Sequence, residues 1–273
     1  MPQVIWITGA SAGIGEAVAV NYARRGNVQL ILSARRIHEL ARVKQRCVEA
    51  GLDPSDVFIL PLDVVATDEH AGKVVTAIDA FGHVDLLLNN AGVSQRSWCV
   101  DTDLAVYRQL FEVDVIGQIS ITKALLPHFI TRKTGHFAVT SSVAGKFGAP
   151  LRTGYSAAKH AVMGFFDALR VEVAAEGIAV STITPGSIAT EVSANALRGD
   201  GERFGMTDKH IAAGMDVDVC AEQIVTGLLN KTREIAVVEG QEMALLNLKR
   251  EDPEACFDRL EVLAGHLRAE GIY

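Results

Sequence analysis

A tyrosine and a lysine four residues apart form the pair with the clearest capacity for acid–base chemistry. They bracket the segment Tyr155-Ser156-Ala157-Ala158-Lys159. On a helix this spacing places both side chains on one face, one turn apart. A free phenol has a pKa near ~10 and gives up a proton poorly at neutral pH. A neighbouring ammonium group favours the phenolate, so the spacing predicts a phenol able to exchange a proton in the working range.

A serine at the end of an apolar run is the candidate partner of this pair. The run Val139-Thr140-Ser141-Ser142 has the character of a strand end, and Ser142 lies thirteen residues before Tyr155. A hydroxyl at that place can hydrogen-bond a substrate oxygen as it gains negative charge. Ser141 is the alternative, but strand alternation turns it to the other face, so we favour Ser142.

A glycine-rich turn near the N-terminus indicates where a nucleotide binds. It joins an apolar run to a helical segment and reads Thr8-Gly9-Ala10-Ser11-Ala12-Gly13-Ile14-Gly15. Glycine allows a sharp turn and a close approach to a pyrophosphate. The following helix N-terminus offers free N–H groups and a partial positive charge. Because the turn lies between strand and helix, dinucleotide binding is favoured over a plain tight turn.

The spacing T-G-x-x-x-G-x-G, together with Y-x-x-x-K, resembles the short-chain dehydrogenase/reductase family. Other family landmarks follow in order along nearly the whole chain. They are Asp63-Val64 after the third strand, Asn89-Asn90-Ala91-Gly92 closing the fourth, and Pro185-Gly186 with Thr190 after the sixth. The resemblance implies an oxidoreductase that transfers hydride between a nicotinamide cofactor and a carbonyl or alcohol substrate.

The resemblance also implies roles for individual residues. In carbonyl reduction Tyr155 protonates the oxygen and Ser142 steadies it, while Lys159 favours the phenolate and orients the nicotinamide ribose; alcohol oxidation reverses this path. The cofactor supplies the hydride chemistry. The implied cofactor contacts are Gly9, Ser11, Gly13, Ile14, Gly15, Arg35, Asp63, Val64, Asn90, Tyr155, Lys159, Pro185, Gly186, Ile188 and Thr190.

The end of the second apolar run predicts a preference for NADP(H). NAD-binding doubly wound proteins carry an acidic residue here, whereas an arginine accommodates the 2′-phosphate of NADP. This chain has Ala34 at the position of the acid and Arg35 next to it, and a guanidinium can bind phosphate through two hydrogen bonds. Arg36 either adds charge or faces solvent. Ala12 lacks the basic side chain that some NADP-preferring relatives have at that position.

One catalytic position departs from the family pattern. Many relatives have an asparagine in the fourth helix that supports a water linked to the active-site lysine, whereas this chain reads Glu112-Val113-Asp114-Val115-Ile116-Gly117. Asp114 is nearly isosteric with asparagine but lacks the NH2 donor and brings a charge. We therefore count Asp114 among the catalytic residues and expect a working enzyme with an altered pH profile.

The chain predicts one α/β domain over residues 1–273, a doubly wound Rossmann parallel sheet of about seven strands with helices on both faces. Short runs apolar on both alternations alternate with helical segments, which favours right-handed crossovers. The expected strands are Val4–Thr8, Val28–Ser33, Val57–Leu62, Val84–Asn89, His136–Ser141, Val180–Pro185 and Glu234–Val238. The expected helices include Glu16–Arg25, Ile37–Ala50, Asp68–Phe81, Asp103–Thr131 and Tyr155–Ala175.

Two segments lie outside this alternation. Residues Gly186–Met215 are rich in glycine and polar residues and read as an insertion after the sixth strand. Ligands of doubly wound sheets sit at the carboxyl ends of strands, so this insertion is a candidate substrate loop; a disordered surface loop is the alternative. The last segment, Asp252–Tyr273, reads as a helix beginning at Pro253 and packing on the outside or against another subunit.

Composition narrows the class of partner. The net charge of −7, without a long run of Lys or Arg, disfavours nucleic acid and anionic membranes. Four scattered cysteines without zinc-type spacing indicate no metal site and a reducing cytoplasm. No stretch approaches the ~20 apolar residues of a membrane span, and the start does not read as a signal peptide.

The predicted function is therefore an NADP(H)-dependent carbonyl reductase or alcohol dehydrogenase. Stretches such as Leu32–Arg46 and Tyr155–Phe166 are similar to a branch with membrane-anchored retinoid and steroid reductases, although this sequence shows no such anchor before its first strand. A hydrophobic carbonyl compound is the expected substrate. A catalytically weak NADP-binding regulatory protein and an epimerase or dehydratase that retains its cofactor are the alternatives. Family resemblance also implies a homodimer or homotetramer.

Overall fold

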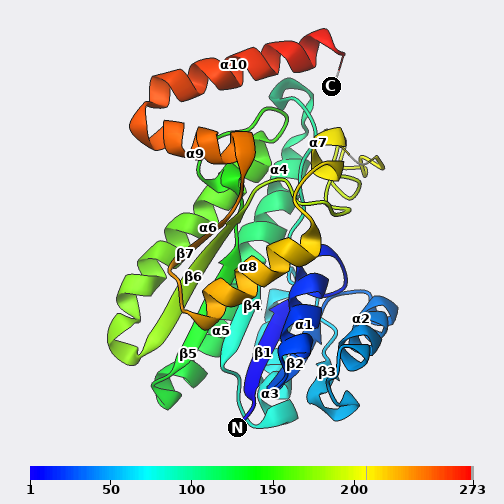
Figure 1. Ribbon diagram of the computed structural model, residues 1–273, viewed down its shortest axis with the longest axis vertical. Coiled ribbons are helices and arrows are strands. Elements are labelled where there is room, and N and C mark those ends of the chain that lie inside the picture. Colours follow the sequence, from blue (N-terminus) through cyan, green and yellow to red (C-terminus); the bar gives the residue numbers. More distant parts are fainter. Residues whose placement is uncertain (207, 272–273) are drawn as a thin grey trace.

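A seven-stranded parallel sheet forms the centre of the computed structural model, which describes residues 1–206 and 208–271 (Figure 1). The strand order is β3-β2-β1-β4-β5-β6-β7. The predicted single doubly wound sheet is confirmed. The strands are β1 Gln3–Thr8, β2 Val28–Ser33, β3 Val57–Ile59, β4 Leu86–Asn89, β5 Gly135–Thr140, β6 Ile178–Pro185 and β7 Glu234–Val237.

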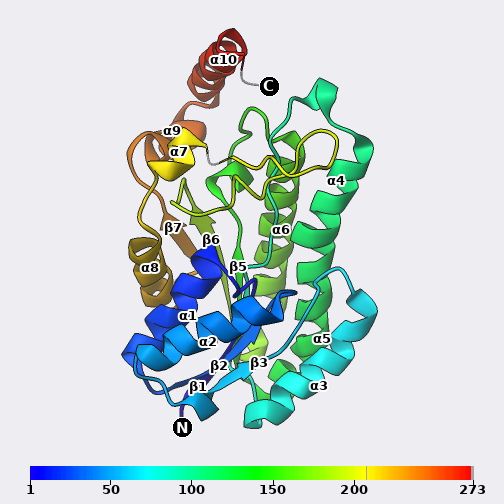
Figure 2. The same cartoon turned by 90° about the vertical axis from the view of Figure 1, so that its right-hand side faces the viewer.

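Helices cover both faces of the sheet, as the alternating pattern predicts (Figures 1 and 2). One face packs against α1 Gly13–Arg25, α2 Ile37–Glu49 and α8 Val217–Leu229. The other packs against α3 His70–Phe81, α5 Gly117–Arg132 and α6 Thr153–Glu172. Because helices cover both sides, β4 and β5 are buried along their whole length.

The order of strands reverses between β1 and β4, which fixes where a ligand can bind. β1 and β4 are adjacent in the sheet. β2 pairs with β1 on the side away from β4, and β5 pairs with β4 on the side away from β1. The connections after β1 and β4 therefore leave the sheet in opposite directions and open a crevice at the carboxyl ends. The glycine turn follows β1, and the segment Asn90–Asp103 follows β4.

Three strands are shorter than predicted, β7 only by its last residue, Val238. Strand β3 stops at Ile59 rather than Leu62, and β4 begins at Leu86 rather than Val84. β3 is an edge strand, and the N–H groups of Leu60 and Leu62 still donate to the Leu32 and Ala34 carbonyls at 3.0 and 3.1 Å beyond its end. Pro61 lies between them and faces the open edge, where a missing N–H breaks no hydrogen bond to β2. The side chain of Asp85 accepts the Val4 N–H at 2.9 Å, so a carboxylate occupies the place of a ladder partner there.

The long helix expected over Asp103–Thr131 is divided. It consists of α4 Leu104–Phe111, a π-helical turn over Glu112–Ile116, and α5. A π turn inserts one residue into the helical repeat and often lies at a functional site. Asp114 is the middle residue of this turn.

The C-terminal part forms a cap at the end of the molecule farthest from the N-terminus (Figure 1). It contains the short helix α7 Lys209–Ala212 and the pair α9 Gly240–Glu251 and α10 Pro253–Ala269. Helix α10 begins at Pro253 as predicted, while the last two residues of the expected helix lie outside the described residues. Among the described helices none is long and apolar enough to cross a bilayer.

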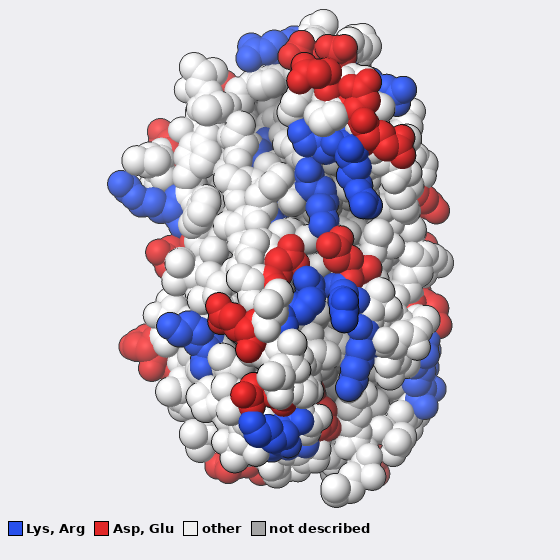
Figure 3. Space-filling model, turned by 90° about the vertical axis from the view of Figure 1, so that its left-hand side faces the viewer, with Lys and Arg blue, Asp and Glu red and all other residues white. Residues whose placement is uncertain are grey.

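The charged side chains are interleaved rather than segregated on the face drawn in Figure 3. Groups of Lys and Arg lie beside groups of Asp and Glu over that face. A nucleic-acid site needs a broad basic surface, and this face does not offer one.

Candidate active site

The N-terminal end of α6 brings Tyr155 and Lys159 together at the carboxyl edge of the sheet. The Lys159 ammonium lies 5.5 Å from the centre of the Tyr155 ring, the one-turn separation that the spacing predicts. Lys159 is buried and donates a hydrogen bond to the Thr140 carbonyl at 3.1 Å. The end of β5 therefore fixes the lysine, while the half-buried Tyr155 remains accessible.

The two neighbouring serines have different surroundings. Ser141 is buried and donates a hydrogen bond to the Lys159 carbonyl at 3.0 Å. Ser142 is half-buried and accepts the Ala144 N–H at 3.1 Å. Ser141 therefore holds the strand end against α6, whereas the Ser142 hydroxyl stays on the accessible side. Both lie just beyond β5, whose last residue is Thr140.

Asp114 is fully buried and faces the active-site lysine. Its Oδ1 accepts the Val93 N–H at 2.9 Å and lies 3.7 Å from the Lys159 ammonium. Burial raises the pKa of Asp114 to about 6, although the Lys159 charge and the Val93 N–H favour the carboxylate. The Oδ2 atom has no hydrogen-bond partner among the described residues. The group therefore changes charge close to neutral pH, directly beside Lys159.

The glycine turn is shaped by close backbone approaches. A Cβ on Gly9, where φ is +66°, would lie 2.8 Å from the Ala91 backbone. A Cβ on Gly15 would lie 2.4 Å from the Gly9 carbonyl oxygen and 2.6 Å from Nδ2 of Asn90. The hydroxyl of Thr8 accepts the N–H groups of Asn90 and Ala91 at 3.0 and 3.2 Å. The ends of β1 and β4 are thereby joined beneath the N-terminus of α1.

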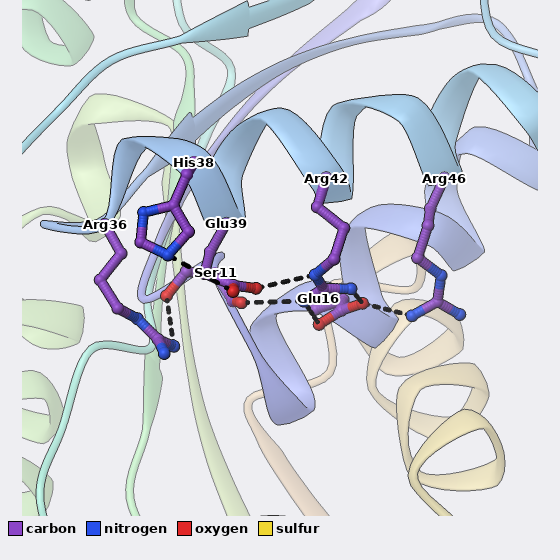
Figure 4. A network of polar contacts seen from close by, with 7 residues as sticks. All are labelled: Ser11, Glu16, Arg36, His38, Glu39, Arg42 and Arg46. Carbon is purple, nitrogen blue, oxygen red and sulfur yellow. Dashed lines mark hydrogen bonds and ion pairs between the residues drawn. The ribbon is translucent and has the colours of Figure 1, made fainter.

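A charged network borders this turn and includes residues that the sequence analysis did not identify (Figure 4). The buried Glu16 of α1 receives two hydrogen bonds from Arg42, at 2.6 and 2.7 Å, and another from Arg46. Burial opposes the charge of Glu16, but the two guanidinium groups hold its pKa below the ordinary value. Arg42 also donates to the Ser11 carbonyl at 3.2 Å, so the network ties α2 to the turn.

The two arginines after β2 differ in their contacts. Arg36 donates a hydrogen bond to the Ser11 hydroxyl at 3.3 Å, so it lies over the glycine turn (Figure 4). Arg35 is exposed at the end of β2. Sequence alone left Arg36 open between added charge and a solvent-facing role, and the geometry gives it a contact with the turn.

The remaining predicted cofactor residues lie around the same edge. Thr190 is close to the glycine turn, since a Cβ on Gly13 would meet its methyl group at 3.5 Å. Ile188 is buried and pairs with Met215 in a short β-bridge. Asp63 accepts the Val65 N–H at 3.2 Å. Asn90 follows β4, and Pro185 and Gly186 are the last residue of β6 and the one after it. Val64 is buried, and Ile14 lies in the first turn of α1.

The segment after β6 packs against the segment after β4. Leu197 donates its N–H to the Ser94 carbonyl at 2.7 Å, and its own carbonyl accepts the Arg96 N–H at 2.8 Å. Arg96 and Asp208 form an ion pair whose side chains are 10% and 5% exposed. Leu197 is buried in a small apolar cluster against which Tyr155 packs. This part of the predicted substrate loop therefore packs into the same apolar cluster as the candidate catalytic tyrosine.

Comparison with known proteins identifies the family. Residues 3–200 match the family model described as short chain dehydrogenase. The chain belongs to the short chain dehydrogenase family. A relative named dehydrogenase/reductase SDR family member 7, from Homo sapiens, is 42% identical over 239 residues, which cover 87% of this chain and 70% of that protein. Another relative, named dehydrogenase/reductase SDR family protein 7-like, from Drosophila melanogaster, is 40% identical over 256 residues. These cover 93% of this chain and 78% of that protein.

Solved structures share the fold of this short chain dehydrogenase. A short chain dehydrogenase/reductase from Burkholderia phymatum in complex with NAD has a TM-score of 0.80 at 23% identity, covering 93% of this chain and 95% of that one. An alcohol dehydrogenase from Thermococcus sibiricus complexed with 5-hydroxy-NADP has a TM-score of 0.72 at 26% identity, covering 86% and 96%. Family membership supports a dehydrogenase or reductase that uses a nicotinamide cofactor.

Proposed function

We propose that this short chain dehydrogenase interconverts a carbonyl compound and a primary or secondary alcohol with NADP(H). The observation that carries the proposal is the arrangement of Tyr155 and Lys159 in the first two turns of α6. The Lys159 ammonium lies 5.5 Å from the centre of the Tyr155 ring. Ser142 begins the turn after β5 that packs on that helix. An acid–base group, its supporting cation and a hydroxyl donor thus gather at one end of the sheet.

The glycine turn fits a dinucleotide. A Cβ at Gly9 or Gly15 would collide with backbone, so the chain must approach closely there. The α1 N-terminus begins at Gly13 and its N-cap residue, Ala12, makes no side-chain cap hydrogen bond. The free N–H groups at a helix N-terminus suit a pyrophosphate.

The cofactor would be held along the carboxyl edge of β1, β2, β4 and β6. When bound, it supplies hydride for reduction or accepts hydride in oxidation. The residues assigned to hold it are Gly9, Ser11, Gly13, Ile14, Gly15, Arg35, Asp63, Val64, Asn90, Tyr155, Lys159, Pro185, Gly186, Ile188 and Thr190.

Each catalytic side chain has one task in this proposal. Tyr155 gives its phenolic proton to the substrate oxygen in reduction and takes it back in oxidation. Ser142 donates a hydrogen bond to the same oxygen as its negative charge grows. Lys159, held by the Thr140 carbonyl, favours the phenolate and lies one turn behind it. Asp114 sets the charge beside Lys159.

The preference for NADP(H) follows from the end of β2. Ala34 carries no carboxylate to repel a phosphate, and Arg35 is exposed beside it. The nearby carboxylates of Glu16 and Glu39 are both engaged by Arg42. Arg36 reaches Ser11, which leaves a second guanidinium next to the proposed phosphate position.

A panel of aldehydes, ketones and alcohols, assayed with NADPH and NADH by nicotinamide absorbance, tests the function. We expect turnover of at least one apolar carbonyl compound with NADPH and a loss of at least about 100-fold in Tyr155→Phe. Absence of turnover with every substrate and both cofactors would favour the regulatory alternative. Product formation without net absorbance change would favour an epimerase or dehydratase.

An Arg35→Asp variant tests the cofactor preference separately. A carboxylate at this position repels a 2′-phosphate and can hydrogen-bond a ribose hydroxyl. We expect kcat/KM for NADPH to fall by at least about tenfold while that for NADH falls less or rises. Arg24→Asp, on the exposed last turn of α1, is the control for added negative charge. Equal effects of Arg35→Asp on both cofactors would refute the preference.

We also propose that the enzyme is a homodimer or homotetramer. Exposed apolar side chains on the α4–α5 line support this proposal, namely Leu104, Phe111, Ile116 and Ile130. Light scattering coupled to size-exclusion chromatography measures the mass directly. A mass of 29.2 kDa at micromolar concentration would contradict it.

A further inference from the structure

Gln95, in the segment after β4, is fully buried and contacts the first turn of the catalytic helix. Its side-chain oxygen accepts the N–H of Gly154 at 2.7 Å and the N–H of Tyr155 at 3.3 Å. The first N–H groups of a helix have no partner within the helix. Arg152, the residue preceding α6, makes no side-chain cap hydrogen bond. A glutamine distant in sequence therefore performs the capping.

The other end of the Gln95 side chain fixes its orientation. Its amide nitrogen donates to the hydroxyls of Ser97 and Thr102 at 3.1 and 3.2 Å. A reversed amide would direct its NH2 group at two backbone donors, so only one orientation satisfies the network. Every polar atom of the side chain is then paired in a buried setting, which makes the contact geometrically specific.

The backbone around Gln95 pairs with the segment after β6. Gln95 and Leu197 form a parallel β-bridge, closed by the hydrogen bonds of Leu197 with Ser94 and Arg96. Leu197 in turn belongs to the apolar cluster against which Tyr155 packs. The segment after β6 thus shares an apolar cluster with Tyr155 and pairs with the backbone of Gln95, whose amide binds the start of α6.

Gly154 shows how tightly Gln95 approaches α6. A Cβ on Gly154 would lie 3.0 Å from the Gln95 oxygen and 2.7 Å from Cδ1 of Tyr107. The Gln95 side chain therefore packs directly on the N-terminal end of α6, and there is no room for a Cβ at residue 154.

We propose that Gln95 is a positioning residue, which holds the Tyr155 backbone in register with the segment after β6 and thereby sets where the phenol meets the substrate. This proposal rests on the proposed function, because it assigns Gln95 its effect through Tyr155. Gln95 itself touches no reacting atom. A shift of the catalytic group by about 1 Å can cost on the order of 100-fold in rate.

Two substitutions at Gln95 separate positioning from folding. Gln95→Met keeps the length of the side chain and removes all four hydrogen bonds, so we expect kcat to fall at least about tenfold with KM for NADPH unchanged within twofold. Gln95→Glu keeps the acceptor for the α6 N–H groups, so kcat should return to within about threefold of wild type at its own optimum. Its carboxylate opposes phenolate formation, so the activity–pH profile should move to higher pH by at least about half a unit.

A spectroscopic titration makes the test independent of turnover. The chain has four tyrosines, and with 13Cζ-labelled tyrosine the signal absent in Tyr155→Phe is that of Tyr155. In Gln95→Glu the titration midpoint of this signal should move to higher pH. If wild type turns over no substrate, the proposed function fails, and this titration still decides the role of Gln95. If Gln95→Met does not fold, Gln95→Glu carries the test alone.

Phe129→Leu is the control for lost stability. Phe129 is fully buried in α5 and packs on Phe137, away from the candidate site. The Phe129→Leu substitution should lower the melting temperature of the protein, while kcat stays within twofold of wild type. The positioning role is overturned if Gln95→Met retains kcat within twofold of Phe129→Leu, or if the Tyr155 titration in Gln95→Glu superimposes on that of wild type.

Discussion

At the residue scale, the departure from the family pattern at Asp114 gives the enzyme a titrating group beside its lysine. An asparagine at this position would carry no charge at any pH. The aspartate is fully buried and its pKa is raised to about 6, so it changes charge near that pH. The pairing with Lys159 is therefore set by pH.

The activity–pH profile of Asp114→Asn tests this difference. Below pH 6 the Asp114 carboxyl is neutral, and above it the carboxylate faces the Lys159 ammonium at 3.7 Å. We expect wild type to show an inflection in kcat near pH 6 that Asp114→Asn lacks. Superimposable profiles would show that the charge at residue 114 does not influence turnover.

The same group predicts a change of stability with pH. The carboxyl releases its proton near 3.8 in the unfolded chain and near 6 in the folded one, so between these values the folded state binds more protons. Stability contributed at this site therefore falls as pH rises from about 4 to about 6. The free energy of unfolding of wild type should decline relative to Asp114→Asn by about 2 kcal/mol across that range. Urea denaturation at a series of pH values measures it, and a constant difference would contradict the expectation.

Local spacing predicted how the residues proposed for the candidate site lie relative to one another. Tyr155 and Lys159 are one helical turn apart because a spacing of four requires it, and Ser141 and Ser142 diverge because of strand alternation. Gln95 and Glu16 were not found, because their roles depend on distant partners. The partners of Gln95 lie 59 and 60 residues away in sequence. Those of Glu16 lie 26 and 30 residues away. No periodicity in one sequence reveals such pairings.

At the element scale, the segment after β6 is held by contacts that differ in burial. Arg96 pairs with Asp208 in a buried ion pair and also lies 5.5 Å from the Phe204 ring centre. Arg198 pairs with Asp200 on the same segment, but both side chains are about half exposed. Burial should make the first pair far more important than the second.

Arg96→Met and Arg198→Met form a matched comparison. Arg96→Met leaves the Asp208 carboxylate buried without its guanidinium and should destabilise the segment by about 3 kcal/mol. Arg198→Met should cost less than about 1 kcal/mol. Limited proteolysis within residues 186–215 and KM for the carbonyl substrate report the result. Equal cleavage rates in the two variants would show that the buried pair does not hold the segment.

The boundaries of elements were less predictable than their existence. The run Asp103–Thr131 has the periodicity of one helix, and the π turn at Glu112–Ile116 shifts that periodicity by only one residue. Helices α8 and α9 were not assigned from the sequence. α8 packs on α1 across the sheet face, while α9 contains no buried residue and so has little core pattern to detect.

At the scale of the whole molecule, the C-terminal cap packs on the turn that begins with Ser142. Val143 and Phe147 share a buried apolar cluster with Val238, Cys256 and Leu260. Helix α10 thus lies about 110 residues along the chain from the serine and yet contacts its turn. Its far end reaches the segment after β4, where the Arg268 guanidinium lies 4.2 Å from the Trp98 ring centre.

Leu260→Ala tests whether this cap supports catalysis. Leu260 is 9% exposed, whereas Leu263 on the same helix is 39% exposed. Leu260→Ala should lower the free energy of unfolding by about 2 kcal/mol or more and lower kcat, because the turn holding Ser142 loses packing. Leu263→Ala should change neither greatly. Denaturant titration measures the free energy of unfolding, and initial rates measure kcat. An unchanged kcat in Leu260→Ala would show that packing of the cap does not affect catalysis at the site.

Transfer of deuterium from labelled cofactor to product tests the central claim most directly. The enzyme is incubated with a carbonyl compound that it reduces and with NADPH that carries deuterium at the pro-R or the pro-S position of nicotinamide C4. The alcohol product is then analysed by mass spectrometry. We predict one deuterium on the carbinol carbon from one of the two labelled cofactors, lost together with product formation in Tyr155→Phe. Alcohol formed without deuterium from either cofactor, or formed equally well by Tyr155→Phe, would contradict the account.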